Sequence, residues 1–195
     1  MKYPFAQFLI LILVFLLFAL PFKAMSLIPA FPGFTDVRPV AAALGPIYAI
    51  FFGPIGCLAM ACGNLIADVM DHALHWSSLA GFSANFFGPF SIWFFWNRFA
   101  KSTFALRTIP QLLTHIALLL MAAILETAII TSAVTNANPE IDASLFACRV
   151  MFDSSIFPIF MGIPMIMLMQ EELGYCPLMN LTAQTTGNAE KNTSH

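Results

Sequence analysis

Long apolar stretches separated by short polar breaks run through most of the chain. A membrane-spanning helix needs roughly 20 mostly apolar residues, and the gaps between charged positions leave room for six of them. We predict these helices at about residues 3–22, 37–52, 54–71, 79–96, 108–134 and 144–169. No charge occurs between Pro39 and Ala67, which is long for one helix, and Gly53-Pro54 near the middle predicts a break into two short helices.

The segments outside these helices differ in character. Residues 24–36 contain Pro29, Pro32 and Gly33, a composition that indicates an extended loop, which we interpret as a structured lid between helices 1 and 2. The last residues are rich in Asn, Thr and Glu and have no apolar period. The sequence therefore predicts one six-helix transmembrane domain over residues 1–170 and a polar tail over residues 171–195.

The distribution of basic residues predicts the orientation, because short cytoplasmic loops are enriched in Lys and Arg. With six helices, one side holds Lys2, Arg98, Lys101, Arg107 and Lys191. The opposite side holds Lys23, with Arg38 and Arg149 near its boundary. Both termini and the tail are thus expected in the cytoplasm, and the lid outside.

Composition supports an integral membrane protein, because 59% of the residues are hydrophobic and only 9% are charged. The near-neutral net charge of −2 excludes the basic surface that a nucleic-acid-binding protein needs. The four cysteines lack metal-site spacing, and the common hydrolase and nucleotide-binding motifs are absent from the sequence. We expect an all-α, multi-pass protein of a prokaryotic-type cell membrane that is not an enzyme and has no cofactor.

Ionisable residues at membrane depth are costly, so each is a candidate for function. On the predicted topology, the outer half of the protein holds two Arg residues and five acids, namely Arg38, Arg149, Asp36, Asp68, Asp71, Glu126 and Asp153. If each Arg neutralises one acid, three carboxyl groups remain, and either some are protonated or the ligand brings positive charge or amino donors. Arg149 and Asp153, four residues apart, either form an ion pair that packs the helices or contact a ligand.

Two groups of polar residues follow helical spacing. Asn64, Asp68, Asp71, His72 and His75 share one stripe of helix 3. The stripe could bind a metal, but a polar face beyond the membrane edge explains both His residues better, and Asn64 and Asp68 are better site candidates. On helix 5, His115 lies toward the cytoplasm and is expected to form an interhelical hydrogen bond.

Four motifs in order resemble the substrate-binding S components of energy-coupling factor (ECF) transporters. They are Phe34-Thr35-Asp36-Val37-Arg38-Pro39, Phe52-Gly53-Pro54-Ile55-Gly56, Gly63-Asn64-Leu65-Ile66-Ala67-Asp68 and Gly81-Phe82-Ser83-Ala84-Asn85-Phe86. Helix 1 departs from the family, since it lacks an Ala-x-x-x-Ala pattern and has only Ala6 and Ala19.

The resemblance implies a six-helix bundle that captures a vitamin, a vitamin precursor or a similar solute from outside, under the loop between helices 1 and 2. It implies as partners a transmembrane coupling protein and two cytoplasmic ATPases. By position in the motifs, the solute-binding residues would be Asp36, Arg38, Asn64, Asp68 and Asn85. We add Glu126, Arg149 and Asp153 to these candidate residues because of their predicted depth in the membrane alone.

Two alternatives remain open from the sequence. One is a membrane-embedded enzyme or assembly factor that uses Asp68, Asp71, His72 and His75 as a metal or acid-base cluster. The other is a stand-alone carrier that protons drive through Glu126 and Asp153.

Overall fold

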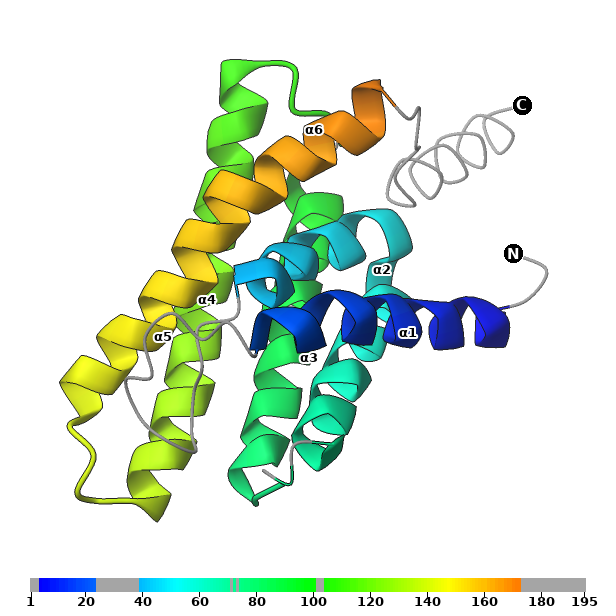
Figure 1. The fold of residues 1–195 in the computed structure, drawn as a ribbon. Coiled ribbons are helices and arrows are strands. Elements are labelled where there is room, and N and C mark those ends of the chain that lie inside the picture. The colour runs from blue at the N-terminus through cyan, green and yellow to red at the C-terminus, as the bar shows by residue number, and fades with distance from the viewer. Residues whose placement is uncertain (1–3, 24–38, 71, 73, 101–103, 173–195) are drawn as a thin grey trace, which may run out of the picture.

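The described part of the chain is almost entirely helical. The computed structural model describes residues 4–23, 39–70, 72, 74–100 and 104–172, and within these ranges it contains no β-strand (Figure 1). The helices are α1 (Pro4–Lys23), α2 (Pro39–Met70), α3 (Ser77–Phe95), α4 (Ile109–Ala137), α5 (Ala143–Phe157) and α6 (Ile163–Glu171). Two π-helical segments, η1 (Trp96–Ala100) and η2 (Pro158–Gly162), extend α3 and join α5 to α6. The expected all-α class is confirmed.

The second helix is broken where Gly53-Pro54 predicts it. Gly53 has φ 61° and ψ −146°, a backbone conformation that strongly favours glycine. Pro54 follows, and its fixed φ and missing N–H suit the first turn of a helix. Figure 1 shows α2 changing direction within its length. The predicted helices 2 and 3 are therefore the two halves of α2.

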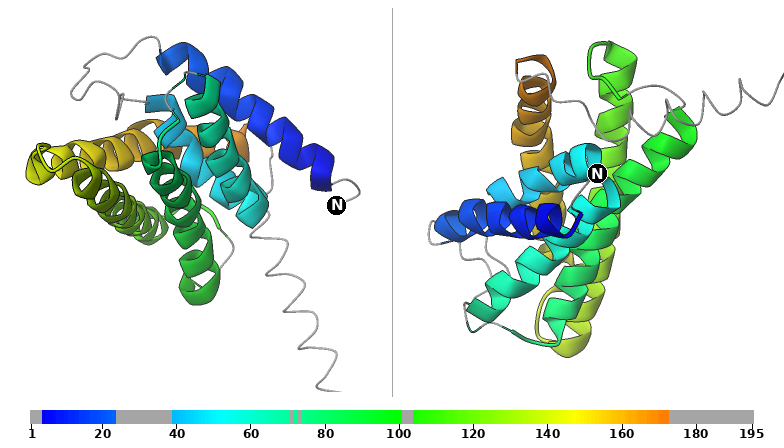
Figure 2. Two further views of the ribbon diagram at one scale, coloured as in Figure 1. Left: turned by 90° about the horizontal axis from the view of Figure 1, so that it is seen from below. Right: turned by 90° about the vertical axis from the view of Figure 1, so that its right-hand side faces the viewer.

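Three helical stretches are long and apolar enough to cross a membrane. They are Ala42–Met70, Ile109–Ala137 and Ala143–Glu171, each of 29 residues, the last comprising α5, η2 and α6. The apolar helix α1 packs against α2, and its axis points across the direction of α3 and α4 rather than along it (Figures 1 and 2). The fold is thus compatible with a membrane protein that has three helices of spanning length.

The main hydrophobic core contains residues of α1, α2, α3, α4 and α6, with α1 packed on α2, α2 on α3 and α3 on α4. The ring of Phe15 is fully buried and fits against α2 because Gly63 has no side chain, and an added methyl there would lie 2.6 Å from the ring. The buried Tyr48 hydroxyl donates a hydrogen bond of 2.8 Å to the carbonyl of Leu11. A close contact and a buried hydrogen bond therefore both attach α1 to α2.

Helices α4 and α5 form a hairpin, and its turn lies between the predicted helices at residues 108–134 and 144–169. Asp142 caps α5, since its carboxylate accepts hydrogen bonds of 2.8 and 3.0 Å from the amides of Ser144 and Leu145. A small core of Val134, Phe146 and Val150 holds the two helices together near the turn. The predicted lid at residues 24–36 and residues 173–195 of the predicted tail lie outside the described residues.

Candidate functional site

One face of α3 brings polar side chains from two neighbouring helices close to its backbone. Gly81, Asn85 and Gly88 are spaced by four and three residues, so they share this face. The Asn85 amide donates a 2.7 Å hydrogen bond to the Gly81 carbonyl. The Asn64 amide of α2, only 9% exposed, lies next to Gly81, since a methyl group added there would be 3.5 Å from Asn64 Nδ2. The structure therefore places both Asn64 and Asn85 beside Gly81.

The carboxylate of Glu126 on α4 occupies the space left by Gly88. A methyl group added at Gly88 would collide with Glu126 Oε1. The Ser154 side chain on α5 forms a hydrogen bond with the same carboxylate. Glu126 is thus held between α3 and α5, in the middle of a helix of spanning length.

Further polar groups continue along the contact between α4 and α5. The Thr127 hydroxyl lies 3.8 Å from the sulfur of Met151, and Val134 packs against α5 nearer the turn. Thr131 lies between these two positions on the same face of α4. On α5, Arg149 and Asp153 are one turn apart and attract each other electrostatically.

We call this region the polar seam. It consists of Glu126, Thr127 and Thr131 on α4 and Arg149, Asp153 and Ser154 on α5. The two buried oxygens Thr131 Oγ1 and Asp153 Oδ1 have no hydrogen-bond partner among the residues that the structure describes. Asp153 interacts with the Arg149 guanidinium, whereas Glu126 is paired with Ser154. Buried polar atoms are rarely unsatisfied in folded proteins, so such a region is suited to binding a polar ligand or water.

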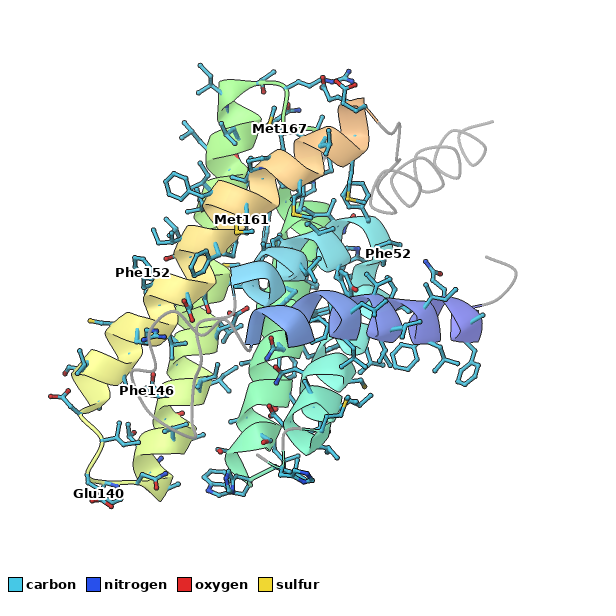
Figure 3. All side chains as sticks on the ribbon, in the orientation of Figure 1. Phe52, Glu140, Phe146, Phe152, Met161 and Met167 are labelled. Carbon is cyan, nitrogen blue, oxygen red and sulfur yellow. The ribbon has the colours of Figure 1, made fainter. Side chains whose placement is uncertain are left out.

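The opposite side of α5 has a different character. Phe152, labelled in Figure 3, is 54% exposed, whereas Phe146 is fully buried against α4. Phe152 and Phe146 therefore lie on different sides of α5.

The remaining predicted site residues are distributed as follows. Asp36 and Arg38 lie outside the described residues. Asp68 is half-buried on α2, one turn beyond Asn64 toward the end of the helix. The structure thus places Arg149 beside Asp153 on α5 and Glu126 against Gly88 and Ser154. Asn64 and Asn85 both lie beside Gly81 on α3.

The histidine stripe at the end of α2 is exposed. His72 and His75 both face solvent, and Asp71 lies outside the described residues. Within the described part of the chain, no three His, Cys, Asp or Glu side chains are placed to hold a metal ion.

The surroundings of His115 differ from those that the sequence predicts. It is completely buried, but neither ring nitrogen has a hydrogen-bond partner among the described residues. Its ring packs edge-on against Trp96 and Phe104, with ring centroids 6.4 and 5.3 Å away. The predicted interhelical hydrogen bond is therefore wrong, because the neighbouring side chains at this depth are aromatic.

Sequence reasoning missed Thr131, Ser154 and Gly88. The sequence distances of Thr131 and Ser154 from the turn of the hairpin could have identified these two residues. Glu126 and Ser154 are equidistant in the chain from Glu140, which lies in the turn labelled in Figure 3. Antiparallel helices of equal rise bring such equidistant residues opposite each other, and the same reasoning pairs Thr131 with Arg149.

Comparison of the chain with family models, curated proteins and solved structures finds no match.

Proposed function

We propose that this chain is the solute-binding membrane subunit of an uptake system of the ECF type. In this proposal six helical segments cross the cell membrane, with α1 and the two halves of α2 counted separately, and both termini are cytoplasmic. The chain binds its solute from outside and does not itself catalyse a reaction. The four sequence motifs and the polar groups within apolar helices support the proposal.

The observation that carries the proposal is the polar seam. Charged side chains within membrane-spanning helices are expensive and commonly mark the path or the site of a solute. Here two acids, one Arg, two Thr and one Ser concentrate on one helix pair, and two of their oxygens are buried without a described partner. A solute with several hydrogen-bonding groups would satisfy these atoms.

The charges of the seam favour a solute that carries an amine. Arg149 offsets one of the two carboxylates, Glu126 and Asp153, so one negative charge is left for the ligand to balance. The amides of Asn64 and Asn85 can both donate and accept hydrogen bonds. A vitamin, vitamin precursor or similar small molecule with amino and carbonyl groups fits this set.

The partners follow from the resemblance to S components. No nucleotide-binding motif occurs in the sequence, so ATP-driven uptake requires other subunits. We propose a transmembrane coupling protein and two cytoplasmic ATPases, with the lipid bilayer around the helices.

The test is identification of the bound solute. The protein is purified gently from its own membrane, and native mass spectrometry identifies small molecules that remain attached. We expect an amine-bearing metabolite that is lost in Glu126→Gln and in Asp153→Asn. Glu140→Gln is the matched control, since Glu140 is an exposed acid in the turn of the same hairpin. A wild-type protein with no bound metabolite, or equal retention in all three variants, would overturn the proposal.

A second candidate is a stand-alone carrier driven by protons. The two carboxylates of the seam, Glu126 and Asp153, favour it, because acids within transporters often carry protons. Deletion of the ATPase partners distinguishes the two candidates. Uptake that persists without them and depends on a proton gradient would support the carrier and contradict the ECF-type subunit.

A further inference from the structure

A chain of phenylalanine rings runs along one side of α3 and η1. Phe86 stacks on Phe90 and Phe90 on Phe94, with centroid distances of 5.5 and 6.1 Å. Phe94 meets Phe95 edge-on at 5.4 Å, and Phe95 stacks on Phe99 at 5.6 Å. We call these five residues the phenylalanine ladder. Each ring touches the next, so the ladder is one continuous apolar strip.

The ladder lies on the outside of the molecule. Phe94 is 45% and Phe99 67% exposed, and the other three rings are partly exposed. From Phe86 to Phe99 the helix rises about 20 Å. This exceeds the roughly 15 Å thickness of one hydrocarbon leaflet. The strip is therefore long enough to accompany a lipid acyl chain through one leaflet.

A positive charge ends the ladder. The guanidinium of Arg98 lies 5.8 Å from the centroid of the Phe99 ring, and the side chain is exposed. Arg98 has no ion-pair partner among the described residues. Arg107, on the same α3–α4 connection, is instead bound to Glu171 at 3.0 Å. Of these two cations, Arg98 is the one left to attract an external anion.

We propose that the phenylalanine ladder and Arg98 bind an anionic phospholipid, with an acyl chain along the rings and the phosphate at the guanidinium. An anionic headgroup is favoured because a zwitterionic one carries its own ammonium group beside the phosphate. The inference rests on the membrane embedding in the proposed function and is independent of the solute.

The experiment uses the full-length protein in nanodiscs that contain equal amounts of phosphatidylglycerol and phosphatidylcholine with matched acyl chains. The protein is then released into mild detergent, and native mass spectrometry counts the lipids that stay bound. We expect wild type to retain phosphatidylglycerol preferentially. Arg98→Gln should reduce this preference about fivefold, the effect of one basic residue at an anionic surface. Arg98→Lys should keep most of it.

Arg107→Gln is the matched control, because Glu171 already neutralises that cation. A wild-type protein without preference, or equal losses in Arg98→Gln and Arg107→Gln, would overturn the proposal. Phe99→Ala should shorten lipid retention, and an unchanged lifetime would contradict the role of the ladder. Soluble glycerol phosphate should not displace the lipid, and displacement would indicate a phosphate site instead. The bound solute is read in the same spectra, so failure of either proposal is seen separately.

Discussion

The two halves of α4, which we call the Glu126 end and the His115 end, bury polar side chains in opposite ways. Around Glu126 the helix meets polar groups of α5 and bare glycine backbone of α3, and a hydrogen bond from Ser154 holds the carboxylate. Around His115 the helix meets the rings of Trp96 and Phe104, and both imidazole nitrogens lack a hydrogen-bond partner among the described residues. One end concentrates polar groups from several helices, and the other isolates a single one.

The difference separates a candidate binding site from a packing feature. A ligand site needs several converging polar groups that can each contact the ligand. A lone histidine within aromatic rings offers two nitrogen atoms and no second group. We therefore expect substitutions near Glu126 to change solute binding, and substitutions at His115 to change stability alone.

The largest effect is expected from Gly88→Ala, which breaks the arrangement at the Glu126 end. The new methyl group would occupy the space of the Glu126 carboxylate, and overpacking of this kind costs about 3 kcal/mol. We expect a lower unfolding free energy in detergent and loss of the bound solute.

Gly81→Ala is the control for this substitution, since its methyl group would make an ordinary contact of 3.5 Å with Asn64. The double variant Gly88→Ala/Glu126→Ala should recover stability without recovering the solute. Equal effects of the two glycine substitutions would contradict the close contact between Gly88 and Glu126.

The sequence predicted the break in α2 because its signal is local. Gly53 and Pro54 act on the backbone conformation at their own positions, whatever packs around them. The ends of the helices were predictable for the same reason, because polar turns and caps such as Asp142 lie at those ends.

The composition of the seam was only partly predictable. Glu126, Arg149 and Asp153 are ionisable within apolar stretches, so their depth alone identifies them. Thr and Ser residues are common in membrane helices. Only the register of α4 against α5 shows that Thr131 and Ser154 belong to the polar seam. The role of Gly88 can be recognised only when the contact between α3 and α4 is known. The aromatic surroundings of His115 likewise depend on packing between distant segments.

The second largest effect is expected at the other end, from His115→Phe. The substitution replaces an imidazole whose nitrogens lack described partners by an apolar ring of similar size. Removal of unsatisfied buried polar atoms should raise the unfolding free energy by about 2 kcal/mol. Solute binding should remain at the wild-type level.

His115→Leu serves as a smaller variant in case the phenyl ring does not fit between Trp96 and Phe104. Chemical denaturation in mild detergent measures both variants. Destabilisation in both would show that the imidazole has a polar partner, and the contrast between the two ends of α4 would then be lost.

Thr131→Val sharpens the comparison with a smaller change. Valine keeps the shape of threonine and removes the buried hydroxyl, which lacks a described partner. The unfolding free energy of the solute-free protein should rise by about 1 kcal/mol. Solute affinity should fall, since the hydroxyl is a proposed contact.

Thr135→Val is the matched control one turn along α4, because its hydroxyl already donates a 2.8 Å hydrogen bond to the Thr131 carbonyl. Titration calorimetry with the identified solute measures the affinities. A greater loss of affinity in Thr135→Val than in Thr131→Val would place the solute away from the seam.

The smallest effect is expected from Arg107→Gln, which tests how much the ion pair of Arg107 stabilises the His115 end of α4. Arg107 and Glu171 form an ion pair of 3.0 Å, but their side chains are 74% and 50% exposed. Such surface pairs contribute about 0.5 kcal/mol or less. The end of α6 is also held by Gln170, whose amide donates a 3.2 Å hydrogen bond to the carbonyl of Phe104. A double-mutant cycle of Arg107→Gln and Glu171→Gln, measured at low and high salt, should therefore give a small coupling energy that salt abolishes. A coupling energy above about 1 kcal/mol that salt leaves unchanged would show that the ion pair, rather than Gln170 and the aromatic packing, stabilises this end of α4.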